Sequence, residues 1–299
     1  MRRLLCVRRG GLGDTLLMLP VLRAMRARVP RATLTFAGVA DHARVLQRFG
    51  VVDAVVSSEA LALWALAGSA DAAARARARL ESYDWIVGDD PALSNLEGPR
   101  APAPGAAGLL DRGVASPCPV VSVFDPHLDA TVTEAAAAVL LGRAGLSGPV
   151  DVDFALPRAP LSAAAPIVLH AGSGAPRKSL PPAALGALAH ALAGRGPLAV
   201  VLGPAEVERG VDADWPPAAC VVRSSSIDAL VDLLRTARVF VGHDSGPTHL
   251  AAALRVPTCA LFLATDPRVW APPGEHVRVL AGVASVAAVV AAVDELGGG

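Results

Sequence analysis

Short apolar runs, each followed by a turn and then a segment with helical spacing, recur along the whole chain. In the first half these runs lie at 3–7, 32–36, 54–56, 85–87 and 120–124. Continuous apolar runs that alternate with helical segments are typical of buried strands in a parallel sheet. The pattern therefore predicts an α/β domain whose first helix spans 15–28.

The same alternation begins again in the second half. Its apolar runs lie at 167–170, 198–202, 220–222, 239–241 and 258–262. A proline-containing segment at 149–166 separates the two series and is typical of a linker. We predict two α/β domains, 1–155 and 156–299. The Pro/Gly/Ala-rich stretch 91–119 is predicted to be a long irregular loop or a mobile lid.

Composition excludes several classes of protein. No run of apolar residues is long enough to span a membrane, and Arg8 and Arg9 end the first apolar run too early for a signal peptide. We therefore expect a cytoplasmic protein. The four cysteines are widely spaced and form no metal-ligand pattern, so buried reduced thiols are expected, with no bound metal.

Charge is balanced overall but uneven along the chain. The formal net charge is +0, which favours neither nucleic acid nor membrane. Residues 1–31 contain eight arginines and one acid, a local excess of +7 that indicates either contact with an acidic acceptor or an anionic surface, or a solvated helix face. Lys178 is the only lysine of the chain, and an ammonium is a compact point charge that arginine does not replace.

The first candidate site is the glycine-rich turn at 8–14, which follows the first predicted strand. Gly11 and Gly13 match half of a dinucleotide-binding fingerprint, but Leu16 occupies the third glycine position. Asp14 is expected at the carboxyl edge of the sheet, where open α/β domains bind ligands. Asp14 is therefore either a candidate functional residue or the N-cap of the following helix.

Two further candidates follow strands of the second half. Ser173 and Gly174 are small enough for close backbone approach to a ligand, and Lys178 adds a positive charge there, so this loop is predicted to bind phosphate unless it is an ordinary flexible loop. Glu206, with Glu208 in reserve, is placed to accept hydrogen bonds from ribose hydroxyls or to be a solvated acid at a helix start.

The stretch 239–250 is predicted to be a strand, a tight turn at 242–247 and a helix from 248 to 254. We expect Asp244 to cap this helix, with the N–H groups of Ser245 and Gly246 free to meet an anion. A helix cap alone would explain the Asp, Ser and Gly residues of this turn, but it does not explain the imidazole of His249 in the first turn of the helix. The remaining candidates of this turn are Pro247, Thr248 and His249.

Several of these motifs together resemble glycosyltransferase family 9, whose best-known members are ADP-heptose:lipopolysaccharide heptosyltransferases. The motifs occur in the same order along the chain as in the family, and none of them falls within 91–160. The motifs are GLGDTLLMLPVL at 11–22, HAGSGAPRKSLP at 170–181, GPAE at 203–206, GHDSGPTHLAAAL at 242–254, and TDP with Trp270 after it.

The resemblance implies a GT-B fold, in which two Rossmann-like doubly wound domains face a central cleft and the last helix often packs back on the first domain. It implies an inverting, metal-independent transfer with no cofactor, from a nucleotide-diphospho-sugar such as ADP-heptose to a glycan or glycolipid, with at most peripheral membrane contact. Asp14 would be the catalytic base, with Arg8, Arg9, Gly11 and Gly13 on the acceptor side. Lys178 and the candidates of the 173–174, 206 and 244–249 segments would bind the donor.

Some positions depart from the family pattern. Leu263 and Ala264 stand where members often have a glycine, and Ser245 stands where many have threonine. These differences leave the donor and the acceptor open. Two other readings remain: a nucleotide-sugar epimerase, which would need acid/base groups beyond Asp14 such as His170 or His243, and a non-catalytic nucleotide-sugar-binding protein.

Overall fold

The computed structural model describes residues 1–96, 120–128, 132, 134–154, 160–162, 164–223, 226–282 and 285–298. Most of the predicted loop or lid at 91–119 therefore lies outside the described residues, as does Cys118. Contacts within the chain divide it into two compact units, Met1–Asp151 and Val152–Gly299. Each unit is described by itself below.

The first unit is built on a five-stranded sheet in the order β3-β2-β1-β4-β5. All neighbouring strands are parallel, as the alternating pattern predicts. Every apolar run singled out in this half forms a strand, and β1 is buried at its centre. The strands are β1 (Arg3–Val7), β2 (Thr33–Gly38), β3 (Ala54–Ser57), β4 (Trp85–Gly88) and β5 (Val120–Val123).

The predicted first helix, 15–28, is two helices in the structure, α1 (Leu12–Leu16) and α2 (Leu19–Arg28). Pro20 lies in the first turn of α2. A proline ring clashes with the carbonyl four residues earlier, here that of Leu16, so a continuous helix cannot pass through this position. The other helical segments are α3 (Ala40–Arg48), α4 (Ser58–Leu61), η1 (Leu63–Ala67), α5 (Ala70–Leu80), η2 (Pro91–Asn95) and α7 (Ala136–Arg143).

The second unit is built on a six-stranded parallel sheet in the order β11-β10-β9-β6-β7-β8. Five of its strands were predicted, and the edge strand β11 was not. The strands are β6 (Ile167–His170), β7 (Leu198–Leu202), β8 (Cys220–Arg223), β9 (Val239–His243), β10 (Thr258–Phe262) and β11 (Val277–Ala281).

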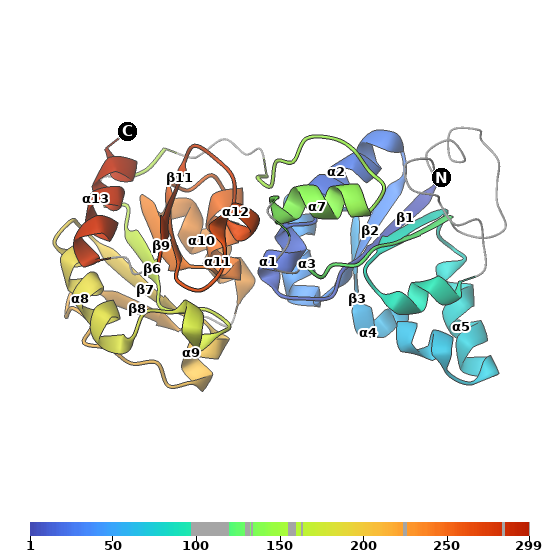
Figure 1. Ribbon diagram of the computed structural model, residues 1–299, viewed down its shortest axis with the longest axis horizontal. Helices are drawn as coiled ribbons and strands as arrows, with labels where there is room; N and C mark the ends of the chain where they lie inside the picture. The colour runs from blue at the N-terminus through green and yellow to red at the C-terminus, as the bar shows by residue number, and fades with distance from the viewer. Residues whose placement is uncertain are drawn as a thin grey trace. The chain divides into compact units, whose positions relative to one another are not determined.

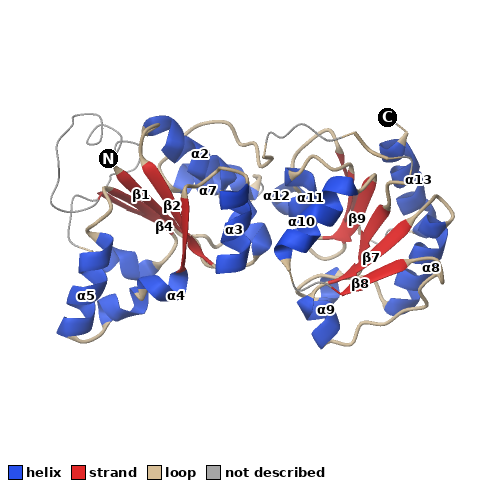
Figure 2. Ribbon diagram, turned by 180° about the vertical axis from the view of Figure 1, so that it is seen from behind, coloured by secondary structure: helices blue, strands red, loops and turns tan. Residues whose placement is uncertain are grey.

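Helices cover both faces of this sheet, as Figures 1 and 2 show. One face carries α8 (Pro182–Ala193) and α13 (Val286–Gly297), and the other carries α10 (Ile227–Thr236), α11 (Gly246–Ala253) and α12 (Pro267–Trp270). A short helix, α9 (Pro204–Glu208), follows β7. The final helix contacts α8, β9, β10 and β11 of its own unit, and its Val289 and Val293 belong to the buried core.

Burial follows position in the sheets. Cys6 and Cys259 lie in central strands and are buried free thiols, but Cys220 is exposed, so the expectation of a buried thiol is wrong there. The reason is that Cys220 begins β8, the edge strand of its sheet, where one side has no neighbouring strand. No helix in the described part of the chain combines the length and the apolar character that a bilayer crossing requires.

Candidate functional site

The strand order of each sheet reverses at one point. In the first unit, the chain adds β2 and β3 on one side of β1 and then β4 and β5 on the other side, so the reversal lies between β1 and β4. In the second unit the reversal lies between β6 and β9. The loops after the two strands at such a point diverge to opposite faces and leave a crevice at the carboxyl edge, where open α/β sheets bind ligands. The predicted candidates Asp14, Lys178 and Asp244 all follow these strands.

Lys178 and Asp244 form the centre of the candidate site in the second unit. The Lys178 ammonium lies 2.7 Å from Oδ2 of Asp244, and the Thr265 hydroxyl donates to the same oxygen at 2.6 Å. The Asp244 side chain is 8% exposed and that of Lys178 is 24% exposed. The lysine is therefore held by a buried carboxylate while part of its side chain remains open to solvent.

The predicted cap of the following helix is wrong in one respect. The helix α11 begins at Gly246, two residues before the predicted start, and its N-cap is Ser245 rather than Asp244. Asp244 does not cap because its carboxylate is already engaged by Lys178 and Thr265. Ser245 and Gly246 are partly exposed in the first turn, where an α-helix leaves its N–H groups without intrahelical partners.

The two later candidates of this helix point inward. The Thr248 hydroxyl donates to the backbone carbonyl of His243 and lies 3.3 Å from the hydroxyl of Ser245. His249 is 5% exposed, so its imidazole packs within the unit. Of the turn 244–249, the partly exposed members are Ser245, Gly246 and Pro247.

His170 and His243, which end the adjacent strands β6 and β9, are buried rather than presented to a substrate. His170 is 3% exposed and His243 is 0% exposed. Burial lowers the pKa of each histidine to about 4. His243 accepts the backbone N–H of Leu180 through Nε2 at 3.0 Å, which requires an unprotonated nitrogen. Both rings are therefore neutral near pH 7, and His243 anchors the end of the 171–181 loop at Leu180.

Glu206 is also inside the unit. Its side chain is 3% exposed, and burial raises the pKa of its carboxyl group. One carboxylate oxygen accepts the backbone N–H of Gly203 at 3.0 Å, and the other accepts the guanidinium of Arg209 at 3.0 Å. Both carboxylate oxygens of Glu206 thus have partners within the chain. The contact of Glu206 with ribose hydroxyls stays a prediction. The reserve candidate Glu208 is exposed.

Sequence reasoning missed Arg209, which holds the loop that bears Ser173 and Gly174. Its guanidinium donates to the carbonyls of both residues, at 2.7 Å and 3.2 Å. The Ser173 hydroxyl in turn donates to the backbone carbonyl of Asp244 at 2.7 Å. The available signal was the spacing of Glu206 and Arg209, which are three residues apart at the end of the short helix α9, so that their charges lie on one side.

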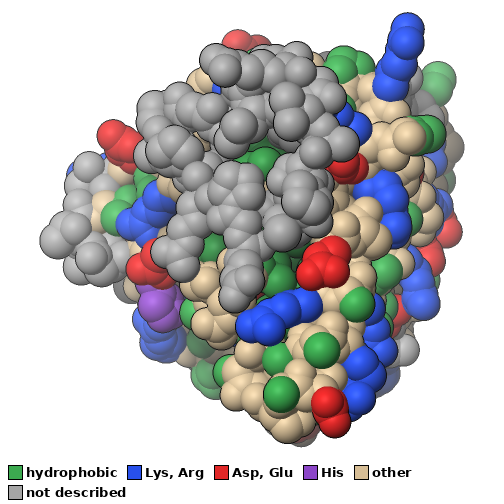
Figure 3. Space-filling view, turned by 90° about the vertical axis from the view of Figure 1, so that its right-hand side faces the viewer, with side chains coloured by type: hydrophobic (Ala, Val, Ile, Leu, Met, Phe, Trp, Pro, Cys, Tyr) green, Lys and Arg blue, Asp and Glu red, His purple; other side chains and the backbone are tan. Residues whose placement is uncertain are grey.

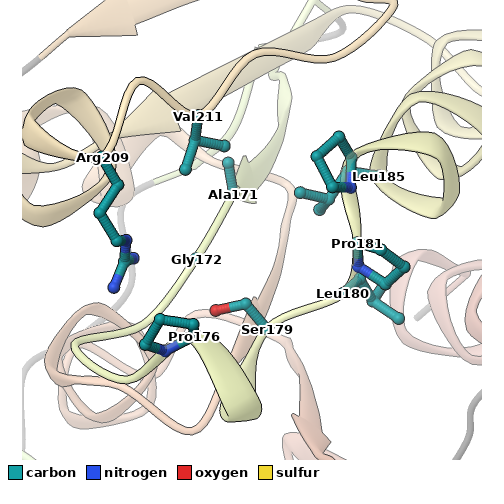
Figure 4. A pocket seen from close by; sticks show the side chains of 10 residues that line it. Ala171, Gly172, Pro176, Ser179, Leu180, Pro181, Leu185, Arg209 and Val211 are labelled. Atoms are coloured by element: carbon teal, nitrogen blue, oxygen red, sulfur yellow. The ribbon is translucent and has the colours of Figure 1, made fainter.

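A pocket of about 330 Å³ adjoins this loop, as Figure 4 shows. The Ser179 hydroxyl points into it, and Arg209 lies on the opposite side. The buried Ser179 oxygen has no hydrogen-bond partner among the described residues. The lining of the pocket is largely apolar, and it therefore suits a ring or an apolar group better than a diphosphate. The lining residues are Ala171, Gly172, Pro176, Ser179, Leu180, Pro181, Pro182, Leu185, Arg209 and Val211.

The candidate site of the first unit centres on Asp14. One oxygen of its carboxylate pairs with the Arg8 guanidinium at 2.6 Å, and the other accepts the backbone N–H of Gly11 at 2.9 Å. The Asp14 side chain is 37% exposed. Gly10 has a φ of +146°, and a Cβ there would overlap the Asp14 carboxylate, so this turn requires glycine.

Asp89, at the end of β4, is a second residue that sequence reasoning missed. It lies 2.9 Å from the other nitrogen of Arg8, and both side chains are 6% exposed. Burial raises the pKa of Asp89, and the charge of Arg8 opposes that shift. Arg8 is therefore enclosed between two carboxylates. Arg9 is 61% exposed, and its Nε lies 3.4 Å from Oδ2 of Asp90.

Several arginines of the segment 1–31 are held by contacts within the first unit. Arg26 pairs with Asp53 at 2.7 Å, and Arg3 lies over the ring of Tyr83 at 4.7 Å. Arg23 donates to the carbonyl of Asp151 at 2.6 Å. Figure 3 shows acidic side chains interspersed with basic ones on one face of the molecule. These contacts favour the interpretation of a solvated, internally paired surface.

No group of three or more His, Cys, Asp or Glu side chains among the described residues is arranged to hold a metal ion.

Comparison with known proteins shows that most of the second unit is similar to one family. Residues 157–292 match the model of Glycosyltransferase family 9 (heptosyltransferase). This range contains Lys178, Asp244 and the whole of α11. A lipopolysaccharide heptosyltransferase 3 from Escherichia coli is 39% identical over 57 residues, which are 19% of this chain and 17% of that protein. The resemblance to family 9 is thus confirmed in the second unit.

Solved structures similar to the whole chain confirm the fold. The E. coli ADP-heptose lipopolysaccharide heptosyltransferase II is 17% identical with a TM-score of 0.70, and the similarity covers 99% of this chain and 98% of that one. The E. coli heptosyltransferase WaaC with ADP is 19% identical with a TM-score of 0.67, over 98% and 99% of the two chains. The predicted fold class, two parallel-sheet α/β domains of GT-B type, is confirmed.

The buried histidines predict a pH dependence of stability. Their folded pKa of about 4 lies below the ordinary 6.5, so the unfolded chain binds more protons between these values, and stability falls as pH falls from about 6.5 to 4. Each histidine contributes a slope of up to about 1.4 kcal/mol per pH unit. His243→Gln keeps an acceptor for Leu180 and should flatten the decline, measured as calorimetric midpoints at several pH values. Equal declines in both proteins would contradict this.

Proposed function

We propose that this protein is a glycosyltransferase that moves a sugar from a nucleotide-diphospho-sugar to a hydroxyl group of a glycan or glycolipid. The observation that carries the proposal is the Lys178–Asp244 pair beside the start of α11, at the point where the strand order reverses. This cluster lies in the unit that matches family 9, whose described members are heptosyltransferases. The comparisons support the prediction of a glycosyltransferase.

ADP-heptose is the donor that we propose. Two similar E. coli structures are described as WaaC with ADP and as WaaC with ADP-2-deoxy-2-fluoro heptose. The second of these has a TM-score of 0.66 and 20% identity to this chain. We infer a donor of the same class because the loops that follow β6 and β9 combine a cation with a helix N-terminus.

Stabilisation of the departing diphosphate falls to the second unit. When the bond between the anomeric carbon and the diphosphate oxygen breaks, negative charge develops on that oxygen. The Lys178 ammonium and the N-terminal amides of α11 at Ser245 and Gly246 meet this charge. Pro247 has no N–H to offer, but its ring favours the first helical turn. We propose that the transfer needs no metal ion.

Activation of the acceptor falls to Asp14. Its carboxylate has about four lone-pair positions, of which Arg8 and Gly11 occupy two, and 37% of the side chain is exposed. We propose that Asp14 takes the proton of the acceptor hydroxyl as that oxygen bonds to the anomeric carbon. Attack from the side opposite to the leaving diphosphate inverts the configuration of that carbon. We assign Arg9 and the start of α1, from Gly11 to Gly13, to the acceptor side as well.

The epimerase alternative is weaker. It requires acid/base groups in addition to Asp14, and the candidates for that role were His170 and His243. Both are buried, and burial keeps the pKa of each at about 4. A non-catalytic binding protein would keep the donor cluster and lose transfer. We expect a cytoplasmic enzyme, with contact to a membrane surface only when the acceptor is a glycolipid.

A donor screen tests the proposed substrate class. We expect ADP-heptose to raise the thermal midpoint more than UDP-glucose or GDP-mannose at equal concentration, because ligand that binds only the folded state stabilises it in proportion to its affinity. A ligand at about 100 times its Kd should add about 2.7 kcal/mol of stability. The absence of any shift with all three sugars would remove the donor assignment.

Replacement of Asp14 tests the base. Asp14→Asn should lower kcat by about 10²–10⁴-fold, the range typical of a lost general base, with the affinity for donor unchanged. Single-turnover sugar transfer and isothermal titration with ADP measure the two quantities. Asp41→Asn, which alters an exposed aspartate paired with Arg44, is the control and should retain transfer. Undiminished transfer by Asp14→Asn would exclude this residue as the base.

Replacement of Lys178 tests the diphosphate site. Lys178→Gln should weaken ADP binding about tenfold or more, because a hydrogen bond from an ionised donor contributes about 1.5–3 kcal/mol. Arg177→Gln is the matched control: it removes a cation from the neighbouring exposed position of the same loop. If both variants lost affinity equally, the effect would be general charge in the loop rather than the ammonium of Lys178.

A further inference from the structure

Arg209 joins three parts of the second unit. It follows the last residue of α9, and its guanidinium donates to the carbonyls of Ser173 and Gly174 and to the carboxylate of Glu206. The side chain of Arg209 is 28% exposed, whereas that of Glu206 is 3% exposed. A planar guanidinium with several fixed donors can hold such a set of acceptors, and a lysine ammonium cannot match its geometry.

The carboxylate beneath Arg209 is itself fixed. Glu206 accepts the backbone N–H of Gly203 at 3.0 Å, which sets its position at the start of α9. The loop backbone packs directly onto this carboxylate, since a Cβ on Gly172 would overlap it. The guanidinium of Arg209 therefore pairs with a carboxylate that is held in place by Gly203, and it contacts the loop from one side.

The two carbonyl contacts determine which way the loop amides point. In a trans peptide the N–H of a residue points opposite to the carbonyl of the residue before it, and the described chain has no cis peptide. With the carbonyls of Ser173 and Gly174 turned toward Arg209, the N–H groups of Gly174 and Ala175 point away from it. Neither amide has an acceptor among the residues that the structure describes.

The same loop is tied to the Lys178–Asp244 pair. The Ser173 hydroxyl donates to the backbone carbonyl of Asp244 at 2.7 Å, and Lys178 lies three residues after Ala175. Successive backbone N–H groups near a cation form a concave site for an anion. The two free amides and the lysine thus belong to one loop whose conformation depends on contacts at both ends.

We propose that Arg209 is a positioning residue that turns the N–H groups of Gly174 and Ala175 toward the diphosphate of the donor. This inference rests on the proposed function, because it takes the loop to be a diphosphate site. Arg209 acts through the loop backbone and does not contact the donor itself. It contributes to affinity for the phosphates and not to affinity for the nucleoside.

The experiment compares ADP with adenosine. Arg209→Met removes every donor, and Arg209→Lys keeps the positive charge beside the buried Glu206, so that the folded state retains its ion pair. We expect both variants to bind ADP about tenfold or more weakly by isothermal titration, since two charge-assisted hydrogen bonds are lost, with adenosine affinity unchanged. Arg195→Gln, which breaks an ion pair with Asp294 in the same unit, should alter neither affinity.

Three results would overturn the role of Arg209. They are unchanged ADP affinity in both variants, equal losses for ADP and adenosine, and full ADP affinity in Arg209→Lys, which would show that charge alone is sufficient. A different result concerns the proposed function: wild-type protein that binds ADP no better than adenosine contradicts a nucleotide-diphosphate donor, and the inference falls with it. Circular dichroism on each variant verifies that the second unit remains folded.

Discussion

The reversal of strand order in each parallel sheet is the constraint on which the candidate sites depend. Between β6 and β9, and between β1 and β4, the following chain segments leave toward opposite faces of the sheet. The carboxyl ends of two neighbouring strands are then left without a covering helix, and polar side chains can collect there. Lys178 with Asp244, and Asp14 with Asp89, follow such strand pairs. The position of each site is therefore a consequence of topology.

Each unit also has an ion pair with a buried carboxylate next to its candidate site. Arg8 with Asp89 adjoins Asp14 of α1, and Arg209, which is 28% exposed, pairs with the buried Glu206 next to the glycine-rich loop. Burying a carboxylate costs free energy, which is why the pKa of Asp89 and of Glu206 is raised. A guanidinium offsets part of that cost and has further donors for the loop above. In both units the remaining donors orient groups assigned to substrate.

The two buried histidines show how burial decides chemistry. In the sequence, His170 and His243 stand at the ends of strands, where acid/base residues of α/β enzymes are found. In the folded chain they lie inside, and loss of hydration disfavours the charged imidazolium. His243 instead accepts the N–H of Leu180 and closes the loop that carries Lys178. Position along the chain indicates the edge of the sheet, but not the direction of the side chain.

The sequence by itself determined every strand except the edge strand β11, the two-domain α/β class, the family resemblance and the loops that bear Asp14, Lys178 and Asp244, because apolar runs and glycine-rich turns are local patterns. The tertiary structure decided the partners. Asp244 meets Lys178 across 66 positions and Arg8 meets Asp89 across 81, and no local pattern encodes such pairs. For this reason Asp244 holds a lysine instead of capping a helix. The contacts of Asp89 with Arg8 and of Arg209 with Ser173 emerged only from the fold, where parallel pairing brings distant strand ends together.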